Sequence, residues 1–117
     1  MATEIEPLIM PFDPLWVTTS KREYREAVRR MGEEPGDTKG KDGLTSCIPG
    51  KGCVIWISRK VKAPDLYALA AHEATHVACD MLASIGEDTP AAEELAYMVQ
   101  TITAGIIIAC GGSDGDD

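Results

Sequence analysis

At 117 residues, 44% of them hydrophobic and 26% charged, the chain has the size and composition of one folded domain with a single modest core. Its formal net charge of −8 argues against binding to a nucleic-acid backbone, which calls for a basic stripe. We therefore expect one domain over residues 1–112, a disordered acidic tail at 113–117, and no nucleic-acid partner.

The sequence carries no recognisable export or membrane signal. Residues 1–14 lack the basic start and the continuous apolar run of a signal peptide. The apolar run at 106–108 is far too short to span a bilayer. We expect a soluble protein of the cytoplasm with no membrane partner.

The N-terminal part of the chain predicts a strand and then a helix. Three prolines within residues 1–14 favour an extended lead-in segment. The next segment, 15–19, is rich in β-branched and aromatic residues and predicts a strand. Ser20 and Glu23 have the spacing of a capping box, and apolar residues recur at helical intervals after them, which predicts a helix over 21–31.

A hairpin is predicted in the middle of the chain. The polar, glycine-rich segment 33–43 indicates a loop, and 44–48 a short strand. After a turn at 49–52, the run 53–58 is the clearest strand pattern in the chain. We expect these two strands to pair antiparallel, and the second one to lie close to the helix that follows it.

The stretch His72-Glu73-Ala74-Thr75-His76 has the pattern H-E-x-x-H. Positions four apart on a helix lie one turn above each other, so His72 and His76 can direct two imidazole nitrogens at one ion. In this pattern the two His bind zinc, and the Glu is the general base of a metal-assisted hydrolysis. These are the only two histidines of the chain, which favours a joint role over a chance surface pair.

The motif lies inside a predicted amphipathic helix. Pro64 with Asp65 indicates the start of this helix, and Gly86 its end. The apolar residues on both sides of the motif recur near helical spacing: Leu66, Leu69, Ala70, Val77, Met81 and Ile85.

A last helix is predicted from about Ala91 to Cys110. Asp88 or Thr89 is the expected N-cap, with Pro90 in the first turn. One face of this helix carries Leu95, Met98, Val99, Ile102 and Ile106. The predicted order of strand, helix, hairpin, motif helix and last helix indicates an α+β domain.

The four cysteines, Cys47, Cys53, Cys79 and Cys110, form no C-x-x-C pair. Cys79 falls inside an apolar helix, where a free thiol packs as a small hydrophobic side chain. We expect buried free thiols. The alternative is a bridge between Cys47 and Cys53 across the intervening turn, in an exported protein.

The motif together with Glu93-Glu94-Leu95-Ala96 resembles the zincins, and within them the gluzincins. The third zinc ligand of gluzincins is a Glu on the helix after the motif helix, often in the pattern E-x-x-A, which Glu93 fits. The order of the predicted elements covers nearly the whole chain and is similar to the minimal gluzincin core, as in small phage-encoded metallopeptidases. The resemblance implies a small mixed or antiparallel sheet packed on the motif helix and the glutamate helix, and the host cytoplasm as location if a phage encodes the protein.

The resemblance also implies a zinc-dependent peptidase acting on a protein or peptide. His72, His76 and Glu93 would hold Zn²⁺ with one open position for water, and Glu73 would take the proton of that water. Tyr97, one turn after Glu93, would donate a hydrogen bond to the oxyanion; the alternative is a packed side chain with no catalytic role. The edge of strand 53–58 would pair with an extended peptide.

Some residues depart from the family pattern and leave alternatives open. Helix phase places Glu94 nearer the apolar face of the last helix, so Glu94 competes with Glu93 as third ligand. Tyr97 stands where some gluzincins carry an acid, and Asp80, one turn beyond His76, is the candidate for a supporting carboxylate. An exposed helix acid is the alternative interpretation of Asp80.

Two other functions remain open for a chain of this size. The first is a non-enzymatic zincin-like protein that binds a partner, with the metal serving stability or regulation. The second is a structural zinc site closed by Asp80 or a Cys as fourth ligand. A general base beside the metal, which Glu73 would be, has no use in a purely structural site.

Overall fold

The computed structural model describes residues 2–5, 14–84 and 92–111. These residues form a four-stranded mixed sheet and three helices, which confirms the expected α+β class. In chain order the elements are β1 (Thr3–Ile5), β2 (Leu15–Thr18), α1 (Lys21–Arg30), β3 (Gly43–Ile48), β4 (Gly52–Ile57), α2 (Asp65–Ser84) and α3 (Ala92–Ala109).

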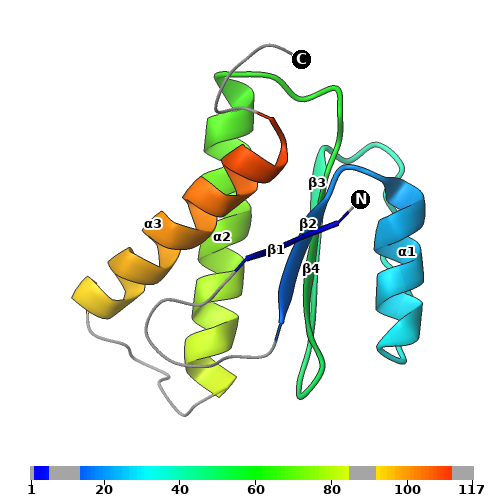
Figure 1. Ribbon diagram of the computed structural model, residues 1–117, viewed down its shortest axis with the longest axis horizontal. Coiled ribbons are helices and arrows are strands. Elements are labelled where there is room, and N and C mark those ends of the chain that lie inside the picture. The colour runs from blue at the N-terminus through cyan, green and yellow to red at the C-terminus, as the bar shows by residue number, and fades with distance from the viewer. Residues whose placement is uncertain (1, 6–13, 85–91, 112–117) are drawn as a thin grey trace.

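The sheet has the strand order β1-β2-β4-β3 and separates two layers of helix (Figure 1). Strand β4 lies inside the sheet, parallel to β2 and antiparallel to β3. All six residues of β4 are buried, because helices cover both faces of the sheet. Its near-continuous apolar sequence is the pattern expected of a strand covered on both faces. Strand β3, by contrast, is an edge strand.

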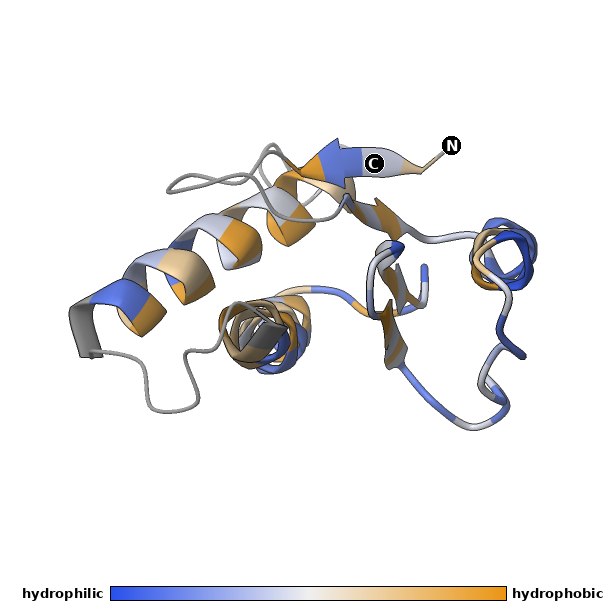
Figure 2. Cartoon of the chain, turned by 90° about the horizontal axis from the view of Figure 1, so that it is seen from below, coloured by the Kyte–Doolittle hydropathy of each residue, from blue (hydrophilic) through white to orange (hydrophobic). Residues whose placement is uncertain are grey.

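Helix α1 covers one face of the sheet. Its first turn is capped by Ser20, whose Oγ accepts a hydrogen bond from the backbone N–H of Glu23, as the capping-box spacing predicts. Tyr24 and Val28 are fully buried on its inner side and pack against β4. Figure 2 shows α1 alone on its side of the sheet, with the hydrophobic side of its ribbon turned toward the strands.

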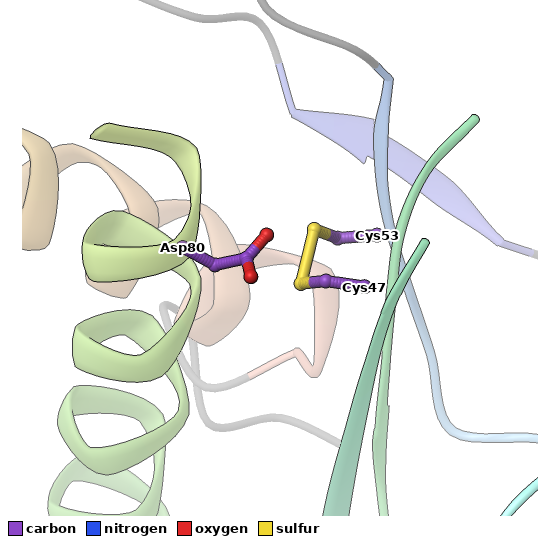
Figure 3. Close-up of side chains that lie close together, drawn as sticks. All are labelled: Cys47, Cys53 and Asp80. Carbon is purple, nitrogen blue, oxygen red and sulfur yellow. A yellow bond between two sulfur atoms is a disulfide. The ribbon is translucent and has the colours of Figure 1, made fainter. Parts of the chain in front are cut away.

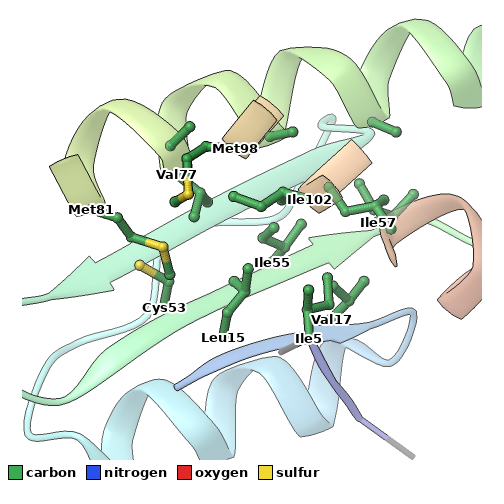
Figure 4. Packing of buried hydrophobic residues seen from close by; sticks show 14 of the residues in the cluster. Ile5, Leu15, Val17, Cys53, Ile55, Ile57, Val77, Met81, Met98 and Ile102 are labelled. Atoms are coloured by element: carbon green, nitrogen blue, oxygen red, sulfur yellow. The ribbon is translucent and has the colours of Figure 1, made fainter. Parts of the chain in front are cut away.

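The larger core lies on the other face, between the sheet and the helices α2 and α3. Ile55 and Ile57 of β4 point into it and meet Val77 of α2 and Ile102 of α3 (Figure 4). This packing holds the motif helix α2 against the sheet. Among the described residues, no helix is long and apolar enough to cross a membrane.

Most predicted boundaries agree with the structure to within two residues, and the hairpin β3–β4 is confirmed. Strand β1 was not predicted. It lies within residues 1–14, for which only an extended segment was expected, and it pairs antiparallel with β2. The predicted helix end at Gly86, the N-cap at Asp88 or Thr89, and the tail at 113–117 lie outside the described residues.

One expectation about the sheet is wrong. The segment 53–58 was expected to offer a free edge to a peptide, but β4 has a hydrogen-bonded neighbour on each side. The free edge of this part of the sheet belongs to β3.

A candidate metal and catalytic groove

Helix α2 presents two different faces along its length. Ala70, Ala74 and Val77 are fully buried on the inner face. His72 and His76, four residues apart, are exposed, and so is Asp80 four residues further on. Residues at this spacing share one side of a helix, so the helix carries both imidazoles and one carboxylate in a row. The two imidazole centroids lie 4.8 Å apart in an edge-to-face arrangement.

Glu73 differs from its two histidine neighbours because it is buried, with 6% of its surface exposed. A buried carboxylate requires a hydrogen-bond partner to offset its lost hydration. That partner comes from the sheet: the Thr45 hydroxyl of β3 donates a hydrogen bond to Oε1 of Glu73. Strand β3 therefore fixes the position of this side chain between the helix and the sheet edge.

A groove of about 500 Å³ runs between α2 and β3. Helix α2 contributes to its lining the two histidines, Glu73 and Asp80, and the strand contributes Gly43, Leu44, Thr45 and Cys47. The structure thus brings His72, Glu73 and His76 together in one open site, with Asp80 at the same groove.

The predicted residues of α3 stand apart from this lining. Tyr97 is 54% exposed on α3, and Glu94 is half-buried on the same helix; neither lines the groove. Glu93 belongs to the first turn of α3, and its side chain lies outside what the structure describes.

The two imidazoles of the groove are donors of the type that zinc prefers. Among the described side chains, neither imidazole makes a hydrogen bond, so their ring nitrogens are available, and imidazole nitrogen is a preferred zinc ligand. Two histidines one helical turn apart would hold the ion, and a carboxylate would complete a three-ligand set. Among the described residues, Asp80 groups with Cys47 and Cys53 and not with the two imidazoles, so the carboxylate that the sequence predicts for this role is Glu93, whose side chain the structure does not describe.

The cysteines correct the sequence-based expectation of free buried thiols. Cys47 and Cys53 lie directly opposite each other on β3 and β4 and form a disulfide. Cys79 is free but exposed, because the helical repeat buries Val77 and Ala78 and turns the next position outward. Cys110 is half-buried, and its burial raises the pKa of the thiol to about 11.

The sequence did not place the β3 residues of the groove at the site, among them Thr45 and Cys47, and it offered the bridge of Cys47 to Cys53 only as an alternative. For Cys47 a signal existed: two cysteines flank a predicted hairpin turn, which places them close to cross-strand positions. For Thr45 no pattern in the sequence indicates the partnership with Glu73, because it depends on how the edge strand docks on the helix.

No family model, curated protein or solved structure matches this chain. The chemistry of the groove itself therefore carries the assignment of function.

Proposed function

We propose that this protein is a zinc-dependent peptidase in which His72 and His76 hold the ion and Glu73 is the general base. One observation carries the proposal: both histidines and the glutamate of the H-E-x-x-H motif open into a single groove walled by a sheet edge. A surface histidine pair would have no need of a buried, positioned carboxylate beside it.

A bound zinc ion would supply Lewis acidity, which polarises a carbonyl and lowers the pKa of a bound water. The residues of the chain do the rest. Thr45 engages Oε1 of Glu73, and Oε2 has no hydrogen-bond partner among the described residues. Oε2 is the oxygen that would accept a proton from the attacking water and pass it to the leaving amine.

The edge strand β3 suits a peptide as substrate. Within the described part of the chain it pairs on one side only, with β4, so the backbone groups of its other side have no strand neighbour there. A peptide added along such an edge is held through its main chain in a fixed register, whatever its sequence. Because β3 also lines the groove, a peptide bound there lies beside the histidines and Glu73.

For the third ligand we propose Glu93, with Glu94 as the competitor. Helix α3 packs along α2, which bears the two histidines. Glu94 is half-buried, and it does not line the groove. Tyr97, one turn after Glu93, keeps the role at the oxyanion that the resemblance implies for it; it is exposed on α3 and does not line the groove.

The test of the function compares Glu73→Gln and His72→Ala with the wild type, in zinc content and in cleavage of a peptide library. His72→Ala should lose the zinc. Glu73→Gln should keep the zinc and the fold while losing on the order of 100- to 10,000-fold in cleavage rate, the usual contribution of a general base. Equal cleavage by wild type and Glu73→Gln would refute the proposal.

A second result would favour the rival function. If neither the wild type nor Glu73→Gln cleaves any peptide but both retain one partner protein equally, the chain is a zincin-like binding protein. Metal-replete Glu73→Gln is the appropriate bait, because it keeps the edge strand and the ion but turns over slowly.

The third ligand is tested by a matched pair on α3. Glu93→Gln should weaken zinc binding by about 10-fold or more, since even second-shell changes reach that size, while Glu94→Gln should change it little. Isothermal titration with zinc measures both, and the reverse order would transfer the ligand role to Glu94.

A further inference from the structure

Two cysteines and an aspartate, residue types that bind metal ions, meet at one end of the groove, beyond the two histidines. The sulfurs of Cys47 and Cys53 and a carboxylate oxygen of Asp80 all lie within 4.8 Å of one another. Figure 3 shows the Asp80 carboxylate on α2 pointing at the disulfide that joins β3 to β4. Three separate elements thus deliver two sulfurs and one oxygen to the same point.

We propose that reduction of this disulfide creates a second metal site, in which Cys47, Cys53 and Asp80 bind a thiophilic divalent cation such as Zn²⁺. Thiolates and carboxylates are both zinc ligands, and the softer thiolates would select zinc over magnesium or calcium. In the oxidised form the two sulfurs carry no thiolate charge and the site does not exist. The protein would therefore bind different numbers of ions in its two redox states.

The reduction requires two electrons, and a dithiol reductant supplies them. The S–S bond breaks, the reductant becomes a disulfide, and its two protons pass to the sulfurs of Cys47 and Cys53. Metal binding then releases these two protons to solvent, because the metal binds thiolates. Two thiolates and one carboxylate carry three negative charges, which the +2 ion largely neutralises.

The hairpin backbone holds the two cysteines in place without the disulfide. Strands β3 and β4 pair at six positions, from Gly43 opposite Ile57 to Ile48 opposite Gly52. Cys53 is also packed in the main core, with 4% of its surface exposed. After reduction the thiols therefore stay on facing strand positions, close to the Asp80 carboxylate.

The second site shares no ligand with the proposed catalytic one, although His76 lies only one helical turn before Asp80. Asp80 lies eight residues beyond His72, which corresponds to roughly 12 Å along the helix axis. An ion held by the cysteines and Asp80 would therefore sit well away from His72. Loss of His72 should leave the second site intact, and this separates the two sites experimentally.

The experiment titrates Cd²⁺ into the full chain and follows the ultraviolet charge-transfer band of cadmium–thiolate bonds, which histidine ligands do not produce. Cys79→Ser and Cys110→Ala are introduced throughout, so that Cys47 and Cys53 are the only cysteines left. One sample is reduced with a trialkylphosphine, which takes an oxygen from water as it donates two electrons, and the other stays oxidised. We expect the band in the reduced sample only, saturating at about one ion per chain.

Three variants test the ligand set and the independence of the sites. Asp80→Asn should weaken Cd²⁺ binding by about 10-fold or more, while Asp65→Asn, an exposed acid at the start of the same helix, should not. His72→Ala should keep the full band. The proposal is overturned if the reduced chain shows no band, if it unfolds by circular dichroism, or if Asp80→Asn binds as tightly as Asp65→Asn.

Discussion

The hydrogen bond between Thr45 and Glu73 is the contact that ties the edge strand to the motif helix, and it can be measured without any catalytic assay. Thr45→Val removes the donor but keeps the β-branched shape that suits a strand. Glu73→Met removes the acceptor at similar length. The two single variants and the double variant form a cycle that isolates the energy of the contact.

The size of the coupling follows from the environment of the two groups. A hydrogen bond to a charged group contributes about 1.5–3 kcal/mol to the free energy of unfolding. Thr45 is half-buried at an open groove, so water replaces part of the lost hydrogen bonding in the variants, and the lower end of this energy range applies. We expect a coupling of about 1.5 kcal/mol, and Thr45→Val alone should lower the urea midpoint by about 1 M for a small domain.

The assay is urea unfolding of metal-free protein, followed by circular dichroism. A control cycle uses Thr75→Val with the same Glu73→Met, because the Thr75 hydroxyl donates to the carbonyl of Ala71 in its own helix. The control coupling should be near zero. If the Thr45 cycle gives no more coupling than the Thr75 cycle, the strand does not hold Glu73, and the assignment of a positioned general base fails with it.

Two further predictions concern the turn and a thiol. Gly52→Ala should lower the free energy of unfolding by about 3 kcal/mol, since φ is +141° and an added Cβ would lie 2.6 Å from the Pro14 carbonyl oxygen. Gly50 has φ of +77° but open space around an added Cβ, so Gly50→Ala should lower the free energy of unfolding by only about 1 kcal/mol, measured by urea unfolding. Equal losses in the two variants would refute the close approach of Gly52 to Pro14. Burial raises the pKa of Cys110 from 9.0 to about 11, so iodoacetamide at pH 8 should label it about 100-fold more slowly in the folded than in the urea-unfolded chain. Mass spectrometry should find Cys79 labelled first, and faster labelling of folded Cys110 would show that its burial is wrong.

Local patterns in the sequence predict most of the elements, because each rests on contacts within a few residues. The cap at Ser20 starts α1 where expected, and the apolar run of β4 forms a strand. The positions of strands within the sheet depend on long-range pairing instead. Nothing near β4 reveals that β2 occupies its second side, so the sequence could not indicate that β3 is the edge.

The same distinction applies to the site. His72, Glu73 and His76 were predicted from spacing on one helix, and the structure places them in one groove. The hydrogen-bond partner of Glu73 comes from β3, whose docking on α2 no local pattern encodes. The exposure of Cys79 was not predicted, because its apolar neighbours suggested a buried position. Successive residues on a helix are rotated by about 100°, so a residue next to a buried one can face solvent.

The parallel pairing of β2 with β4 has a consequence for the order of folding. These strands are joined through α1, a loop and β3, so their pairing must close a long loop, whereas β3, β4 and α2 follow one another along the chain. We expect the hairpin and α2 to associate first through nearby contacts, and β2 to add to the far side of β4 afterwards. Both walls of the groove belong to this early unit, so the groove takes shape before the sheet is complete.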